Sequence, residues 1–259
     1  MKRTALITGA SGGLGTEFAR IHAAKGDNLV LVARNKDKMD ALKLELINQF
    51  GIDVYVIPID LSEPAAAKVI YNELQVRDIA VDYLINNAGF GDFGFFALCN
   101  WDKQLEMINL NVTALTYLTR LFLSDMIDNK FGKILNVAST AAFQPGPTMS
   151  IYFATKAFVL SFSEAIANEL QGTEVTVTAL CPGATNTGFK AVADLGESNL
   201  FKGRGIASSK SVAEFGYNAM MKGKAVAVHG FVNLFMAQSV RFVPRSVVTM
   251  IARMKLREK

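Results

Sequence analysis

Short apolar runs alternate with longer segments of helical pattern along the whole chain. Most of the runs are continuously apolar, which is typical of strands that are buried on both faces of a sheet. Seven runs predict strands, at residues 5–8, 29–33, 54–59, 83–85, 134–137, 175–180 and 225–228. The segments between them predict helices, which include residues 18–25, 38–50, 65–78, 103–128 and 152–170.

This alternation predicts an α/β fold. We expect a doubly wound parallel sheet (Rossmann-like) of about seven strands with helices on both faces. No linker divides the chain, so residues 1–259 are expected to form a single dinucleotide-binding and catalytic domain. In such a sheet, ligands bind beyond the carboxyl ends of the strands near the switch point in strand order. Candidate chemistry is therefore sought in the residues that follow each apolar run.

Composition narrows the class of protein. A chain that is 51% hydrophobic with a net charge of +4 is not intrinsically disordered. Two cysteines cannot make a disulfide framework, and the apolar run at the start is shorter than a signal-peptide core. No uninterrupted apolar run reaches the roughly 18 residues of a membrane span. A cytoplasmic globular protein is therefore expected.

A glycine-rich loop, Thr8-Gly9-Ala10-Ser11-Gly12-Gly13-Leu14-Gly15, follows the first predicted strand and leads into a helix. Glycine lets the backbone turn sharply and approach a phosphate closely. The N-terminus of a helix offers free N–H groups and a positive dipole end to an anion. The loop therefore predicts a dinucleotide-binding turn, with a tight turn that holds no ligand as the alternative.

Arg34 ends the second predicted strand, 19 residues after Gly15. NAD-binding proteins of this fold carry an acidic residue near this position, but no Asp or Glu lies between Asp27 and Asp37. An arginine there can hold the 2′-phosphate of NADP(H) through charge-assisted hydrogen bonds. The sequence therefore favours NADP(H) over NAD(H), and the alternative is a solvated arginine at the end of a loop.

Tyr152 and Lys156 are four residues apart in a predicted helix, so they share one of its faces. Such a pair also arises by chance. Ser139 supports a functional role for this pair. It lies 13 residues before Tyr152, directly after the fifth predicted strand, where ligands bind in such a sheet.

With these motifs in this order, the chain resembles the short-chain dehydrogenase/reductase family of the classical type, from Thr4 to about Thr187. Two positions depart from the family pattern. Ala138 stands where members often carry serine, and Gly12 stands where many NADP-using members carry a basic residue. The motifs that carry the resemblance are Thr8–Gly15, Asp60-Leu61, Asn86-Asn87-Ala88-Gly89, Asn111, Asn136-Val137-Ala138-Ser139, Tyr152-Phe153-Ala154-Thr155-Lys156 and Pro182-Gly183-Ala184-Thr185-Asn186-Thr187.

The resemblance implies a role for each catalytic candidate. Tyr152 would be the general acid in carbonyl reduction and the base in alcohol oxidation, and Ser139 would hold the substrate oxygen. A free tyrosine has a pKa near 10, so a pKa near 7 requires roughly 4 kcal/mol of preferential stabilisation of the phenolate. Lys156 and an oxidised nicotinamide would supply positive charge for it. Asn111 would anchor a water that links Lys156 to solvent, with a solvent-facing helix residue as the alternative.

The resemblance also implies the contacts of the cofactor, although Asn, Gly, Pro and Thr are common in ordinary turns as well. Tyr152 and Lys156 would contribute to this site in addition to their catalytic roles. The other expected contacts are Gly9, Ser11, Gly13, Leu14, Gly15 and Arg34 on the phosphate side, Asp60 and Leu61 at the adenine end, Asn87, Ala88 and Gly89 at the adenosine ribose, and Pro182, Gly183, Thr185 and Thr187 around the nicotinamide.

Two further segments bear on the substrate, and a third bears on the surroundings of the protein. Four phenylalanines in residues 90–96, together with residues 143–149, predict an apolar pocket or, alternatively, rings that pack beneath loops. Glycines among polar residues predict a substrate lid at about 188–211, with a disordered loop as the alternative. A basic amphipathic tail at about 231–259 would cover the core, meet a neighbouring subunit or touch an anionic membrane. The first two of these roles are favoured.

Together these features predict an NADP(H)-dependent oxidoreductase that interconverts a ketone or aldehyde and its alcohol by hydride transfer. A 3-oxoacyl or steroid-like ketone is the expected substrate. The alternatives are a non-catalytic NADP(H)-sensing regulatory protein and a membrane-surface scaffold that uses the tail. Family members commonly pair, so a dimer or tetramer is expected. No cluster of potential metal ligands accompanies His22 or His229 in the sequence, so no metal site is expected there. The basic residues of the tail do not indicate nucleic-acid binding.

Overall fold

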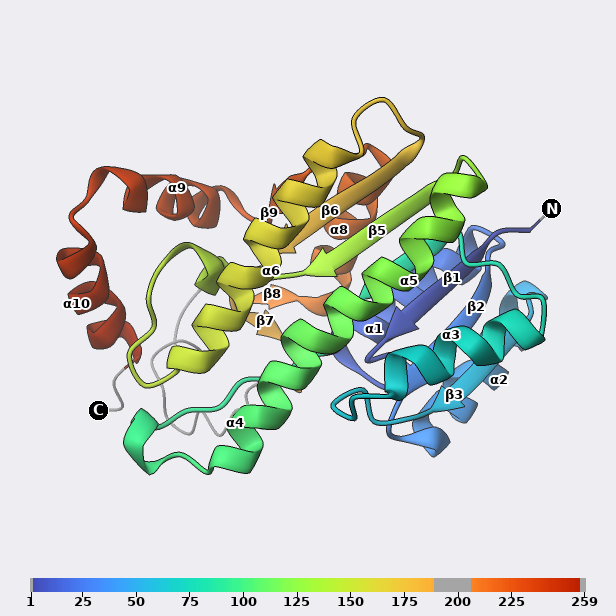
Figure 1. Ribbon diagram of the computed structural model, residues 1–259, viewed down its shortest axis with the longest axis horizontal. Coiled ribbons are helices and arrows are strands. Elements are labelled where there is room, and N and C mark those ends of the chain that lie inside the picture. Colours follow the sequence, from blue (N-terminus) through green and yellow to red (C-terminus); the bar gives the residue numbers. More distant parts are fainter. Residues whose placement is uncertain (1, 189–205, 257–259) are drawn as a thin grey trace.

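A computed structural model describes residues 2–188 and 206–256 of the chain. Its main element is a sheet of seven parallel strands in the order β3-β2-β1-β4-β5-β6-β9 (Figure 1). Each of the seven runs predicted as a strand overlaps one of them, so the predicted doubly wound sheet is confirmed. The strands are β1 (Thr4–Thr8), β2 (Asn28–Ala33), β3 (Val54–Pro58), β4 (Tyr83–Asn86), β5 (Gly132–Val137), β6 (Val175–Cys181) and β9 (Val226–Val228).

Helices cover both faces of this sheet (Figure 1). On one face, Ala5 and Ile7 of β1 pack in the same cluster as Phe18 of helix α1. Leu6 of β1 points to the other face and packs in the same cluster as Phe122 of helix α5. This alternation explains the continuously apolar strands, since both faces of the central strands are buried. Helices α1 (Gly13–Ala24), α2 (Lys36–Phe50) and α8 (Ser209–Met221) belong to the first face, and α3 (Ala66–Val76), α5 (Leu115–Asp128) and α6 (Ser150–Glu169) to the second.

The strand order places a switch point between β1 and β4. From β1 the chain moves outward to β2 and β3, and it then returns to the other side of β1 as β4. The hydroxyl of Thr8, at the end of β1, accepts hydrogen bonds from the backbone N–H groups of Asn87 and Ala88, both at 2.9 Å. The loops after the central strands are thereby held together at one edge of the sheet, where ligands bind in this fold.

The long helix predicted at residues 103–128 has three parts. It begins as α4 (Trp101–Ile108), widens into a π-helical turn, η2 (Asn109–Ala114), and continues as α5. Asn100 caps the start, since its side chain accepts a hydrogen bond from the Lys103 backbone N–H at 3.1 Å. π turns inside α-helices are frequently found at functional sites.

Two predicted segments at the C-terminal side have a mixed outcome. Residues 189–205 of the predicted lid lie outside the described residues, while residues 207–211 are strand β8 (Ala207–Ser208) and the first turn of α8. Strand β8 pairs with β7 (Thr185–Asn186). The predicted tail forms α9 (Phe231–Ser239), the short 3-10 turn η5 (Val240–Phe242) and α10 (Arg245–Leu256). Among the described helices, none has the length and hydropathy needed to cross a membrane.

Candidate active site

Three of the predicted catalytic side chains lie close together beyond the end of β5. Ser139 follows β5 and caps the 3-10 turn η3 (Thr140–Phe143), and its hydroxyl also hydrogen-bonds Tyr152. Tyr152 lies in the first turn of α6 and Lys156 in the next. The ammonium of Lys156 donates to the backbone carbonyl of Val137 at 2.8 Å and lies 5.9 Å from the centre of the Tyr152 ring. Strand β5 and helix α6 thus converge on one site.

Burial has opposite effects on the two titratable groups. It raises the pKa of Tyr152 to about 12, against which the hydrogen bond from Ser139 acts. It lowers the pKa of Lys156 to about 8, a shift that Cys181 opposes. In both cases the charged form loses solvation. The residues around Tyr152 therefore do not bring its pKa toward 7, and the phenol stays protonated at neutral pH.

Asn111 lies in the π turn and is fully buried, so it is not a solvent-facing residue. Its amide group donates to the Phe90 carbonyl at 2.9 Å and to the Thr155 hydroxyl at 3.1 Å, and its oxygen accepts from the Phe90 N–H at 3.2 Å. These bonds connect the helix to the loop after β4 and to α6. The expected water between Asn111 and Lys156 stays a prediction.

The glycine-rich loop has the close backbone approach that its glycines predict. A methyl group on Gly15 would lie 2.2 Å from the carbonyl oxygen of Gly9, and Gly9 itself has a φ of +66°. Helix α1 starts at Gly13, and its first turn carries neither a capping side-chain bond nor an acidic residue. The N–H groups at this helix start fit an anionic phosphate. Side-chain atoms of Thr187 lie opposite Gly13, 3.1 Å from the place of a methyl group there.

Arg34 extends from the end of β2 toward Asp60, which follows β3. Its guanidinium lies 3.5 Å from the Asp60 carboxylate, and 71% of the side chain is exposed. Burial acts to raise the pKa of Asp60, but hydrogen bonds from Ser62 and the charge of Arg34 outweigh it and lower that pKa. An exposed guanidinium at this corner is free to meet a second anion such as a phosphate.

The remaining predicted cofactor residues lie along the same edge. Pro182 and Gly183 follow β6, and the Pro182 carbonyl accepts from the Thr140 N–H at 2.9 Å, which joins this segment to Ser139's turn. The others occupy loops or element ends as follows: Ser11 in the glycine loop, Leu14 in α1, Leu61 after β3, Asn87, Ala88 and Gly89 after β4, and Thr185 in β7.

Comparison with known proteins decides the family. A model of the short chain dehydrogenase family matches residues 3–197 of this chain. The chain is a short-chain dehydrogenase. The match extends over most of the described sheet and includes the loops that hold the candidate catalytic residues.

Three proteins show what this short-chain dehydrogenase is similar to in sequence and in structure. A short-chain dehydrogenase from Sphingobium yanoikuyae in complex with NADPH is 32% identical, with a TM-score of 0.83 over 93% of this chain and 94% of that chain. A bulky-bulky ketone specific alcohol dehydrogenase from Comamonas testosteroni is 30% identical, with a TM-score of 0.79 over 93% of this chain and 92% of that chain. A very-long-chain 3-oxoacyl-CoA reductase from Anas platyrhynchos is 31% identical over 69% of this chain, and the match spans 58% of that reductase.

The structure also assigns a place to residues whose contacts the sequence does not reveal. Thr155 accepts from Asn111 and donates to the Tyr152 carbonyl at 2.7 Å, so it joins two of the predicted catalytic residues. Asn233 of α9 faces Gly183, where a methyl group would lie 2.5 Å from its amide nitrogen. The contacts of Thr155 with Asn111 and of Asn233 with Gly183 join residues that are far apart in the sequence, and no spacing pattern indicates them.

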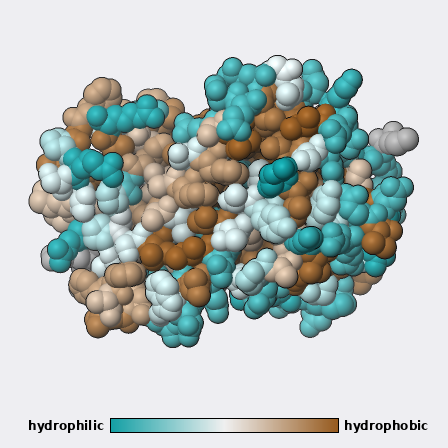
Figure 2. All heavy atoms as spheres, in the orientation of Figure 1, coloured by the Kyte–Doolittle hydropathy of each residue, from teal (hydrophilic) through white to brown (hydrophobic). Residues whose placement is uncertain are grey.

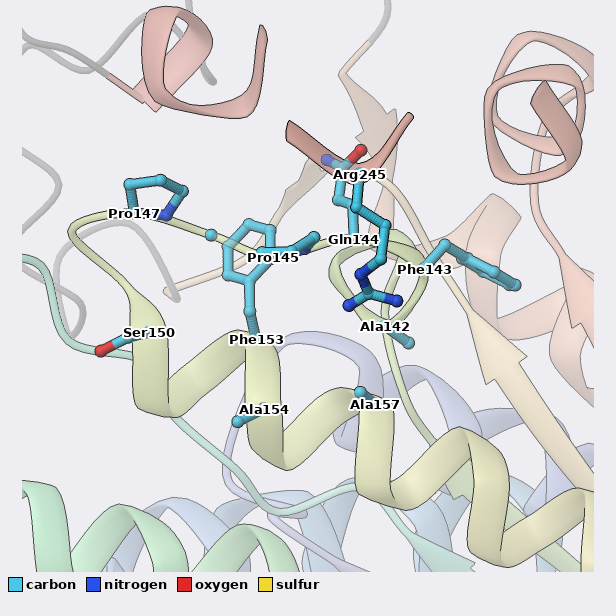
Figure 3. A pocket seen from close by; sticks show the side chains of 11 residues that line it. Ala142, Phe143, Gln144, Pro145, Pro147, Ser150, Phe153, Ala154, Ala157 and Arg245 are labelled. Atoms are coloured by element: carbon cyan, nitrogen blue, oxygen red, sulfur yellow. The ribbon is translucent and has the colours of Figure 1, made fainter. Parts of the chain in front are cut away.

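The apolar residues near the site divide into two groups. Phe93 packs with Tyr152, Phe153 and Leu256, whereas Phe95 and Phe96 are exposed. A pocket of about 450 Å³, lined in part by Phe153, lies between the η3–α6 connection, the Ala154–Ala157 stretch and Arg245 (Figure 3). Neither Tyr152 nor Lys156 lines this pocket. Phe93 and Phe153 thus supply apolar surface beside the phenol, and Phe153 also lines the pocket.

Proposed function

We propose that this short-chain dehydrogenase is an NADP(H)-dependent oxidoreductase that interconverts a ketone or aldehyde and the corresponding alcohol. The observation that carries the proposal is the position of Tyr152, beside Ser139 and Lys156, at the sheet edge that also holds the glycine loop. A proton donor, a second hydroxyl and a cation then lie where the carboxyl ends of the central strands meet. Bound NADPH supplies the hydride in the reductive direction.

The side chains have distinct tasks in this reaction. The Ser139 hydroxyl donates a hydrogen bond to the carbonyl oxygen of the substrate and orients it. Tyr152, protonated because burial raises its pKa, delivers the proton to the same oxygen as negative charge develops there. Lys156 is held by the Val137 carbonyl and places its positive charge near the phenolate that remains. Alcohol oxidation follows the same path in reverse, with Tyr152 as the base.

The residues expected around the phosphates of the cofactor favour NADP(H). The uncapped start of α1 fits a diphosphate, and the closely packed Gly9 and Gly15 leave no room there for larger side chains. Arg34 would hold the 2′-phosphate, since its guanidinium makes only a 3.5 Å contact with Asp60. The NADPH complex of the Sphingobium relative supports this choice.

An apolar, bulky ketone is the substrate class that the site favours. Phe93 and Leu256 pack in the same cluster as Tyr152, so the phenol has apolar neighbours on this side. The names of the Comamonas and Anas relatives point to bulky ketones and 3-oxoacyl thioesters for those proteins. A 3-oxoacyl or steroid-like ketone is therefore our candidate for this chain.

The comparisons lend no support to a non-catalytic sensor or to a scaffold, because the relatives described above are named as dehydrogenases and a reductase. The homo-oligomer and the cytoplasmic location stay predictions.

The test is NADPH oxidation by the purified chain with ketones of increasing bulk, followed by a 3-oxoacyl thioester and a steroid ketone. We expect turnover whose kcat/KM rises with the apolar bulk of the substrate. Binding of NADPH without turnover on any carbonyl would overturn the enzymatic proposal. Turnover that is fastest with small polar aldehydes would overturn the substrate class alone.

A further inference from the structure

In helices α9 and α10 and in η5 between them, more apolar side chains are exposed than buried. In α9 only Ala237 is buried, whereas Phe231 is 82% exposed and Phe235 66%. Phe242 in η5 is 87% exposed. In Figure 2, apolar and hydrophilic residues lie side by side at the end of the molecule where Figure 1 places α9 and α10. We call this surface, from Phe231 to Leu256, the tail surface.

Helix α10 attaches to the rest of the protein along one narrow stripe. Val248, Ala252 and Leu256 are buried, at a spacing of four residues. Met250 and Met254 form a second apolar stripe and are more than half exposed. An amphipathic helix that only covers a core would keep its apolar residues on the buried side. The tail surface therefore covers the core with one stripe and offers another to something outside the described chain.

The charge of the tail surface is of one sign. From Phe231 to Leu256 the chain contains Arg241, Arg245, Arg253 and Lys255 but no acidic residue. Within residues 2–188 and 206–256, none of these four cations forms an ion pair with a carboxylate. Lys255 instead lies 3.7 Å from the sulfur of Met236, a contact that connects α10 to α9. The partner that complements this surface is apolar and anionic.

A second copy of the chain does not meet that requirement. A two-fold interface brings the same patch of both copies together. Four cations would then face four cations with no carboxylate from residues 231–256 on either side, and like charges across an interface are unfavourable. An anionic bilayer offers acyl chains to the exposed phenylalanines and methionines and headgroup charge to the arginines.

We propose that the tail surface docks this protein on an anionic lipid bilayer, with α9 and α10 lying in the plane of the membrane interface. The position of α10 gives the docking a consequence for the active site. Leu256, at the end of α10, packs in the same cluster as Phe93 and Tyr152. Docking through the exposed stripe of α10 thus places the apolar neighbours of Tyr152 one helix away from the lipid, which would be a source of apolar substrate. The docking itself does not depend on the proposed function.

The test is flotation of the full-length protein with vesicles of phosphatidylcholine alone or with added phosphatidylglycerol. We expect the protein to float with the anionic vesicles and to stay behind with the neutral ones. Added salt should reduce the bound fraction, because it screens the charges of the arginines and the headgroups. The readout needs no substrate or turnover, so failure to bind is distinct from failure of the proposed reaction.

Two pairs of substitutions with matched controls assign the binding to the tail surface. Phe235→Ser with Phe242→Ser should lower partitioning at least tenfold, while Leu44→Ser with Val76→Ser, 61% and 88% exposed on α2 and α3, should leave it unchanged. Arg241→Glu with Arg253→Glu should abolish the preference for anionic vesicles. Lys68→Glu with Lys210→Glu, also exposed and with the same change in net charge, should keep it.

Three results would overturn the proposal. The first is absence of flotation with anionic vesicles at low salt. The second is equal loss of binding in the tail variants and in their controls. The third is an oligomer in solution that dissociates on Phe235→Ser with Phe242→Ser while vesicle binding is absent, because the tail surface would then be an interface between copies.

Discussion

At the scale of single residues, the main finding is that burial separates the titrations of the two catalytic candidates. The pKa of Tyr152 is raised to about 12, and that of Lys156 is lowered to about 8. The donor of the proton is therefore protonated throughout the neutral range, which suits carbonyl reduction. The cation beside it is present below about pH 8 and is lost above that pH.

The pH dependence of ketone reduction should reflect the titration of Lys156. Because Lys156 loses its charge above a pKa of about 8, kcat/KM for the ketone should fall by roughly tenfold per pH unit above that value. Lys156→Arg keeps a cation that does not titrate, so its lower activity should be flat from pH 7 to about pH 10. A wild-type profile without a fall before pH 10 would contradict this reading of the site.

A second residue-scale prediction concerns the choice of cofactor. Arg34→Leu removes the exposed guanidinium at the end of β2, and a hydrogen bond to a charged group contributes about 1.5–3 kcal/mol. We therefore expect the KM for NADPH to rise by about 10-fold to 100-fold and the KM for NADH to change little. Arg120→Leu, an exposed arginine on α5, is the control and should change neither KM. Equal effects of Arg34→Leu on both cofactors would show that Arg34 does not contact the 2′-phosphate.

At the scale of elements, the register of α6 against the sheet determines where Tyr152 lies. Below the site, the Asn136 side chain on β5 donates to the Ser163 hydroxyl on α6 at 2.9 Å and accepts from Asn86 on β4 at the same distance. All three residues are buried. A polar network of this kind fixes one relative position of strand and helix, since any shift leaves buried groups without partners.

Ser163→Ala tests the strength of this connection. The substitution leaves the Asn136 amide without its acceptor in a buried position, so the free energy of unfolding should fall by about 1–3 kcal/mol. Ser161→Ala changes an exposed residue two positions away on α6 and should be nearly neutral. Urea denaturation measures both, and equal stability of the two variants would show that the network does not hold the helix.

The elements also show where prediction from sequence ends. The seven strands follow from the apolar runs, because burial on both faces leaves a direct mark on the sequence. The π turn at Asn109–Ala114 does not follow from a pattern, and the segment is predicted as continuous helix. Its distinctive contacts join Asn111 to Phe90 and Thr155, residues 21 and 44 positions away. Contacts over such separations arise from the tertiary fold.

At the scale of the whole molecule, the strand order brings the sequence motifs together at one edge of the sheet. The glycine loop after β1, the segment after β4, Ser139 after β5 and Pro182 after β6 are separated by up to 173 residues. In the sheet they follow adjacent parallel strands. A parallel sheet brings carboxyl ends to one edge, so their proximity is predictable. The pKa of Tyr152 is not, because it depends on how deeply α6 and its neighbours bury the phenol.

The asymmetry of the molecule is a second property at this scale. The predicted basic tail forms two helices at one end, with apolar and cationic residues exposed together. The sequence favours a role for the tail in covering the core or meeting a subunit. The structure shows that α10 buries one apolar stripe and leaves other apolar residues exposed, and the proposed docking rests on these exposed residues.

The most direct test of the proposed mechanism is transfer of deuterium from NADPH, labelled at its transferable C4 position, to a bulky ketone. The wild-type alcohol should gain one deuterium at the former carbonyl carbon. Tyr152→Phe should lower kcat by about 10²–10⁴-fold while NADPH still binds. Tyr71→Phe, which removes a phenol that bonds Asp125 far from the site, should react as the wild type does. An alcohol without deuterium, or a wild-type rate in Tyr152→Phe, would contradict the mechanism.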